Sequence, residues 1–114
     1  MAIYHFSAKV ISRASGSSAV AAAAYCSASR LRDERLDRHH DFSNKAGVVH
    51  SEVMLPGGAP EEWLDRERLW NDVEAAELRK DAQLAREVEF AIPREISQAD
   101  GIELARDFVR QEFV

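Results

Sequence analysis

The chain has 114 residues, of which 46% are apolar, and it carries a formal charge of −5. This length corresponds to a single domain with a modest core. The one cysteine, Cys26, excludes an internal disulfide, and no apolar run approaches the length of a membrane span. We therefore expect a cytoplasmic protein that has no membrane partner.

The first half of the chain is predicted to contain a strand, a helix and a loop. Residues 3–11 alternate between apolar and polar side chains, as a half-buried strand does. Ser17 and Ser18 are candidate N-caps of an alanine-rich helix that we expect to run to about Leu31. Residues 33–46 are polar and contain two histidines, which predicts an exposed loop.

The second half predicts two strands and two helices. The expected elements are a strand Gly47–Leu55, a turn Pro56–Pro60, a helix from Pro60 to about Lys80, a strand Leu84–Ile92 and a helix from Ser97 onward. The strands alternate in polarity and are not continuously apolar, which favours antiparallel pairing. The expected fold class is α+β, with an antiparallel-rich sheet and helices packed on it.

The formal charge differs between the two halves. Residues 1–50 carry seven Lys and Arg against four acids, whereas the other 64 residues carry eight against sixteen. Phosphate contacts are therefore favoured in the first half, although so mild an asymmetry is also common on ordinary solvated surfaces. The candidate DNA-binding residues are Lys9, Arg13, Ser17 and Ser18, which lie around the predicted helix N-terminus, where a phosphate can bind.

Tyr25 is the candidate nucleophile. It follows Ala21–Ala24 on the predicted helix, close in sequence to the serines and to Arg13. A phenol held beside a bound phosphodiester can attack it. A lone tyrosine on an alanine-rich helix is, however, more often a packing residue.

Glu87 and Glu89 are candidate helpers of this tyrosine. Their spacing of two on a strand puts both carboxylates on one face of the sheet. A phenol is a weak nucleophile at neutral pH because it holds its proton, so a carboxylate that accepts or orients that proton would assist it. The alternative is a strand face that simply meets solvent.

The four histidines do not predict a metal site. A metal site needs three convergent ligands, and the spacing of His5, His39, His40 and His50 demands none. His39 and His40 lie in the predicted loop, and His50 on a predicted strand is more often structural. His5 could face either Tyr25 or the core.

Three segments, taken together, resemble a known family: Ala2–Lys9, Ser18–Tyr25 and Arg86–Pro93. In this order and at these spacings they resemble the N-terminal part of the MobA/MobL-family relaxases, most of all the TraA type of Ti-type conjugative plasmids. Val49–Glu52 and Trp70–Glu74 extend the resemblance along the chain.

The resemblance implies a DNA relaxase of the HUH type. Tyr25 would attack a phosphodiester of single-stranded origin-of-transfer DNA, which leaves a 5′-phosphotyrosyl link and a free 3′-hydroxyl. Glu87 and Glu89 would lie near this tyrosine. Other relaxosome proteins are further candidate partners.

The resemblance also implies a divalent metal, Mg²⁺ or Mn²⁺, in the complete protein. Members of the family carry a His-x-His pair on a strand further along than residue 114, and this sequence contains no such pair. We therefore expect residues 1–114 to be the N-terminal portion of the relaxase domain, to bind no metal and to be inactive alone. The helical pattern continues to Val114 without a cap or stop residue, which also predicts that the domain is cut at this point.

The alternative function belongs to a different class. An acidic domain of this size could be a protein-interaction module that binds through its helix Glu61–Lys80, or a decayed relaxase remnant. Tyr25 would then have no chemical role.

Overall fold

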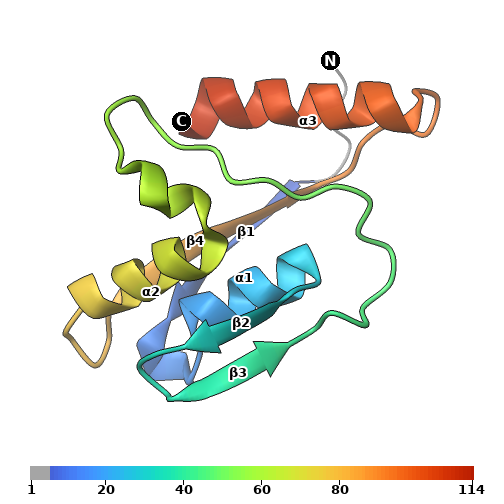
Figure 1. Ribbon diagram of the computed structural model, residues 1–114. Helices are drawn as coiled ribbons and strands as arrows, with labels where there is room; N and C mark the ends of the chain where they lie inside the picture. Colours follow the sequence, from blue (N-terminus) through green and yellow to red (C-terminus); the bar gives the residue numbers. More distant parts are fainter. Residues whose placement is uncertain (1–5) are drawn as a thin grey trace.

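The computed structural model describes residues 6–114, so His5 and the start of the first predicted strand lie outside the described residues. Within this range the fold contains three α-helices and two antiparallel pairs of strands (Figure 1). The elements are β1 (Phe6–Ser12), α1 (Ala19–Ser27), β2 (Arg30–Asp33), β3 (Arg38–Asp41), α2 (Arg66–Ala76), β4 (Gln83–Phe90) and α3 (Gln98–Phe113). The expected α+β class is confirmed.

The first sheet pairs the first strand of the described range with the last one. β1 pairs with β4 in antiparallel register, with Lys9 opposite Glu87 and Ser7 opposite Glu89. The register shifts between Ile11 and Ser12, where the strand ends in a short 3-10 turn, Arg13–Ser15. The pairing therefore places the side chains of Lys9 and Glu87 next to each other on the face of the sheet that meets α1.

Helix α1 begins where it was predicted to begin and ends earlier. The Ser18 side chain accepts a hydrogen bond from the backbone nitrogen of Ala21 at 3.1 Å and caps the first turn. The helix ends at Ser27 because Ala28 adopts a left-handed conformation, with φ 52°. The prediction that the helix reaches Leu31 is wrong, since Leu31 lies in β2.

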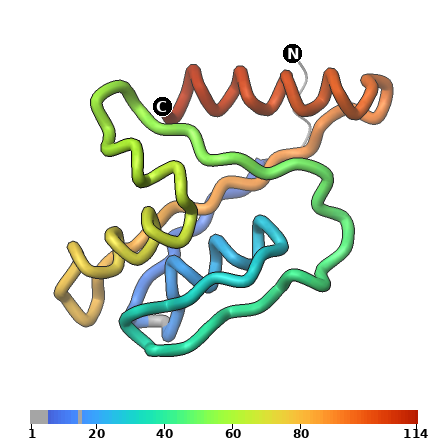
Figure 2. The backbone as a smooth tube through the Cα atoms, in the orientation of Figure 1, coloured from blue at the N-terminus to red at the C-terminus, as the bar shows by residue number. Residues whose placement is uncertain are grey.

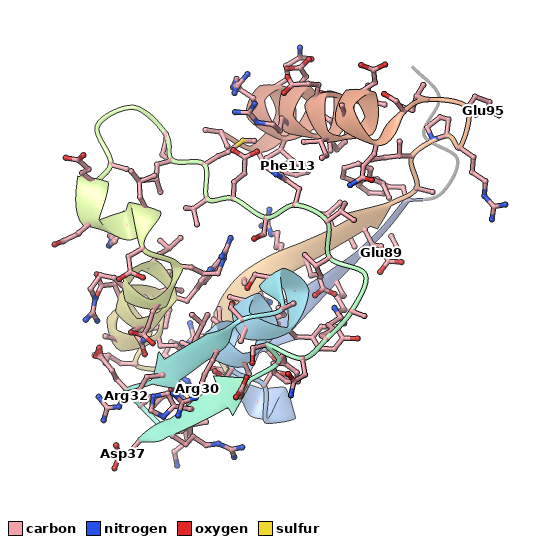
Figure 3. The ribbon with its side chains drawn as sticks, turned by 45° about the vertical axis from the view of Figure 1, so that its right-hand side comes forward. Arg30, Arg32, Asp37, Glu89, Glu95 and Phe113 are labelled. Atoms are coloured by element: carbon pink, nitrogen blue, oxygen red, sulfur yellow. The ribbon has the colours of Figure 1, made fainter. Side chains whose placement is uncertain are left out.

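Residues 33–46, the expected loop, contain the turn and the second strand of a β-hairpin whose first strand begins at Arg30. β2 and β3 pair in antiparallel register, and Asp37 makes the turn with φ 51°. An aspartate tolerates this left-handed conformation better than most residues do. The hairpin carries Arg30 and Arg32 on its outer face, as Figure 3 shows.

The predicted strand Gly47–Leu55 is also wrong. This stretch belongs to a long irregular segment between β3 and the turn Glu61–Leu64, drawn in green in Figure 2. It forms no ladder with either described sheet, and extended backbone becomes a strand only beside a hydrogen-bonded neighbour. An ion pair of 2.7 Å between Glu52 and Arg106 connects the segment to α3.

The last three elements follow the predicted pattern more closely, although α2 ends at Ala76 and not at about Lys80 as predicted. The helix expected to start at Pro60 is divided at Asp65, which caps α2 by accepting from the Glu67 nitrogen at 3.1 Å. β4 and α3 match the predicted strand and helix, with Ser97 as the N-cap of α3. No helix in the described part of the chain has the length and apolar character needed to cross a membrane.

The core lies around α1 and is small. Val20 and Ala24 pack on Leu31 of β2, while Ala19 packs on Leu84 of β4. Trp70 of α2 contacts both groups. Small alanine side chains let strands and a helix pack against α1 from several sides.

A candidate tyrosine site

Tyr25 lies on the last turn of α1 with its ring half exposed, at 52%. The edge-to-face contact with Phe42 has a centroid distance of 5.4 Å, and the Lys45 ammonium lies 3.7 Å from the centroid of the Tyr25 ring. The phenol oxygen makes no hydrogen bond within residues 6–114. The ring is therefore held by contacts with Phe42 and Lys45, while about half of the residue's surface stays exposed.

Glu87 faces α1 but binds the neighbour of Tyr25. Its carboxylate accepts from the Cys26 thiol at 3.4 Å and pairs with the Lys9 ammonium at 3.0 Å. Lys9 holds the pKa of Glu87 below its ordinary value, and Glu87 in turn raises the pKa of Lys9. Burial, and then the Glu87 carboxylate, raise the pKa of the Cys26 thiol.

Glu89 lies two residues further along β4 and is exposed, as Figure 3 shows. It makes no hydrogen bond to Tyr25 among the described residues, and neither does Glu87. The structure thus brings Glu87 beside α1 without a direct contact to the phenol. The proposed assistance by either carboxylate stays a prediction.

A carboxylate side chain of the protein itself, that of Glu74, binds the N-terminus of α1. The Glu74 carboxylate of α2 accepts from the Ala19 backbone nitrogen at 2.7 Å and pairs with Arg13 and Arg35, each at 2.9 Å. Its side chain is only 2% exposed. Glu74 therefore takes the place that the sequence interpretation gave to phosphate.

Arg13 and Ser18 are engaged inside the fold. The Arg13 guanidinium donates to the backbone oxygens of Glu74, Glu77 and Arg79 as well as to the Glu74 carboxylate. Ser18 is buried and donates to Asp33 at 2.6 Å. Their contact with phosphate stays a prediction, and it would require these internal bonds to be exchanged.

The other two candidate DNA-binding residues are more accessible. Ser17 is partly exposed between the 3-10 turn and α1. The Lys9 side chain is 70% exposed, so it can contact a phosphate without any rearrangement of the fold. Lys9 is therefore the candidate whose position best suits contact with DNA.

Asp33 is a buried acid that the sequence reading did not identify. It is fully buried and accepts from Ser18, from the His40 ring at 3.0 Å and from the Leu36 backbone nitrogen. Burial by itself would raise the pKa of Asp33, but these hydrogen bonds outweigh it and hold the pKa below its ordinary value. Asp33 thus ties the hairpin to the start of α1.

The acidic residues of α2 mostly serve internal contacts. Glu67 accepts from the Arg32 backbone nitrogen at 2.6 Å, and Asp72 accepts from the Trp63 ring at 2.9 Å. Together with Glu74, these residues hold the hairpin and the 3-10 turns in place. The interaction-module alternative requires a free acidic face on this helix. Because these acids already bind other parts of the fold, the helix is poorly suited to that role.

The described residues contain no complete metal site. Within residues 6–114, no group of three or more His, Cys, Asp or Glu side chains is placed to hold an ion. His40 is bound to Asp33 and His50 to Glu52, while His39 lies exposed on β3.

A family comparison decides the identity of the domain. Residues 17–114 match the MobA/MobL family. The chain belongs to this family. Its residues from the α1 cap to the end of α3, Tyr25 included, lie within the matched range, and the resemblance carried by the three sequence segments is confirmed.

Relatives of the chain are named as transfer and mobilization proteins. It is 47% identical over 110 residues to a mobilization protein MobL of Acidithiobacillus ferridurans, covering 96% of this chain and 28% of that protein. It is 42% identical over 125 residues to a conjugal transfer protein TraA of Agrobacterium fabrum, covering 100% of this chain and 11% of that protein. The chain thus spans only a minor part of these relatives.

A solved structure has the same fold. It comes from a study of the molecular basis of vancomycin resistance transfer in Staphylococcus aureus, and it matches with a TM-score of 0.91 and 43% identity. The match covers 96% of this chain and 56% of that one. The arrangement of helices and sheets around Tyr25 is therefore a shared feature of the two proteins.

Proposed function

We propose that this chain supplies the tyrosine nucleophile of a DNA relaxase, which nicks one strand at a plasmid origin of transfer during conjugation or mobilization. The observation that carries the proposal is the half-exposed position of Tyr25 at the end of α1, within the family-matched range. The substrate is single-stranded origin DNA, and the proposed setting is the cytoplasm, with other relaxosome proteins as candidate partners.

The reaction is a transesterification. The Tyr25 oxygen forms a bond to phosphorus, and the bond from phosphorus to the 3′-oxygen of the preceding nucleotide breaks. The protein keeps a 5′-phosphotyrosyl link, and the 3′-oxygen gains a proton and leaves as a hydroxyl. The phenol proton passes to a base while the new bond forms.

Glu87 and Glu89 are proposed to assist this step in different ways. The Glu87 carboxylate is already bound to Lys9 and Cys26, so we assign it the task of fixing α1 against β4. Glu89 is exposed and can accept a proton directly or through water. The Mg²⁺ or Mn²⁺ ion implied by the family resemblance would polarise the scissile phosphate when held by residues outside those described.

The contribution of Lys9 is electrostatic. Its exposed ammonium lies on the same sheet face as Glu87, next to α1, where it can approach a phosphate of the bound strand. Ser17 is proposed to contribute a polar contact near the start of α1. Arg13 and Ser18 support this surface from inside.

Peptide mapping tests the proposal. The full-length protein is incubated with a labelled single-stranded origin oligonucleotide and magnesium or manganese, then digested with trypsin. Cleavage after Arg13 and Arg30 releases residues 14–30, whose one tyrosine is Tyr25. We expect the nucleotide adduct on this peptide. An adduct on a different peptide, or none at all, would contradict the proposal.

A further inference from the structure

One short turn contacts Tyr25 from two directions. After β3 the chain turns at residues 42–45, where the Lys45 backbone nitrogen donates to the Phe42 oxygen at 2.9 Å. This turn places the Phe42 ring against the Tyr25 ring and the Lys45 ammonium over its face. Both contacts therefore depend on the β2–β3 hairpin.

Lys45 also binds the backbone of Tyr25. Its ammonium donates to the Tyr25 carbonyl oxygen at 3.0 Å. That carbonyl lies in the last turn of α1 and also accepts from the Ala28 backbone nitrogen at 3.3 Å, and the helix dipole favours a cation at this end. One ammonium thus adds a second hydrogen bond at the helix end and holds the ring that projects from it.

The orientation of the ring decides where the hydroxyl lies. Phe42 limits rotation on one side, and the cation–π contact with Lys45 favours one placement of the ring. Nucleophilic attack depends steeply on the position of the attacking atom. A residue that fixes this ring can therefore affect the rate without touching DNA.

We propose that Lys45 is a positioning residue for Tyr25 and that it acts by holding the phenol in the orientation for attack. The inference rests on the proposed function, because it assumes that Tyr25 is the nucleophile. Lys45 acts together with Phe42, and its charge serves the ring and the helix end. It is not assigned a contact with the substrate.

Three variants of the full-length protein separate this role from others. Lys45→Met keeps the length of the side chain and removes the charge, Lys45→Arg keeps a cation that can stack on the ring, and Lys80→Met is an exposed control on another surface. At saturating origin oligonucleotide, we expect adduct formation by Lys45→Met to slow by about tenfold. Lys45→Arg should recover most of the rate, and Lys80→Met should match the unchanged protein.

The dissociation constant for the oligonucleotide completes the test. We expect Lys45→Met to leave it within about twofold, because exposed charges elsewhere supply the binding. A loss confined to affinity, with an unchanged rate at saturation, would overturn the inference and make Lys45 a phosphate contact.

A measurement without DNA tests the contact between Lys45 and Tyr25 separately from the assignment of Tyr25 as the nucleophile. With ring-labelled tyrosine, the Tyr25 NMR signals should shift in Lys45→Met and move back toward their original positions in Lys45→Arg. Unshifted signals would overturn the contact itself. If the unchanged protein forms no adduct, the proposed function fails and the positioning role fails with it, whereas equal adduct rates in the unchanged protein and Lys45→Met overturn only the role of Lys45.

Discussion

The Glu74 carboxylate lies 2.7 Å from the backbone nitrogen of Ala19, so a residue of α2 completes the N-terminus of α1. The same carboxylate pairs with Arg13 and Arg35, which come from the end of β1 and from the hairpin. Four segments of the chain meet at this one buried acid. Because α1 carries Tyr25 at its other end, this junction fixes the direction in which the tyrosine projects.

Glu74→Gln should therefore destabilise the fold. The change keeps the shape of the side chain but leaves two arginines without their buried counter-charge. We expect the free energy of unfolding to fall by about 3 kcal/mol, the order found when a buried ion pair is broken. Urea denaturation measures the loss.

Glu95→Gln is the matched control for Glu74. Glu95 is exposed in the connection before α3, as Figure 3 shows, and its change should alter the unfolding free energy by less than about 0.5 kcal/mol. If the two variants lose similar amounts, Glu74 is no more important than a surface acid.

Asp33 should make stability depend on pH in the acid range. The hydrogen bonds from Ser18 and His40 hold the pKa of Asp33 below its ordinary value, against the effect of burial. The stabilisation is therefore complete above the unfolded-state pKa, about 3.9, and is lost as the pH falls through the folded-state pKa. Below about pH 4, the unfolding free energy of Asp33→Asn should fall less steeply with decreasing pH.

Urea denaturation between about pH 2 and pH 6 checks this slope. Asp107→Asn, an exposed change on α3, should keep the slope of the unchanged protein. An Asp33→Asn slope equal to that of the unchanged protein would show that this carboxylate is not coupled to folding.

The Cys26 thiol reports on the position of Glu87. Burial and the nearby carboxylate raise the pKa of Cys26, so little thiolate is present at neutral pH and alkylation should be slow. Glu87→Gln removes the charge and lowers this pKa. The rate of iodoacetamide labelling at constant pH should then rise several-fold.

Glu89→Gln is the matched control on the same strand. Glu89 makes no recorded contact with Cys26 and should leave the labelling rate unchanged. Equal rates in both variants would mean that Glu87 does not face α1 as the structure shows.

The sequence predicted the elements that carry strong local signals. β4 alternates in polarity up to Phe90, before Pro93, and α3 begins at a serine cap followed by a helical repeat. The early end of α1 was missed because its left-handed residue is Ala28, which carries no stop signal, whereas a glycine would have done so. The hairpin was missed because β2 contains a single apolar residue, Leu31.

Only part of the site is predictable from the sequence, because several of its contacts join residues that are far apart in the chain. Tyr25 is predicted from its position on an alanine-rich helix near Arg13, and the family resemblance strengthens that prediction, while Glu87 is predicted because strand periodicity places it on a definite face. Glu74 reads as one more charge on an acidic helix, and its burial depends on Arg13, which is 61 residues away. Lys45 gave no signal beyond its charge, because its contact with Tyr25 requires the hairpin to form first.

A denaturing gel of the full-length protein incubated with origin DNA and magnesium or manganese shows whether Tyr25 is the nucleophile. We expect a shifted protein–DNA band for the unchanged protein and none for Tyr25→Phe, with noncovalent DNA binding largely retained because it comes from many contacts. A shifted band from Tyr25→Phe of the same intensity would contradict the assignment of Tyr25 as the nucleophile.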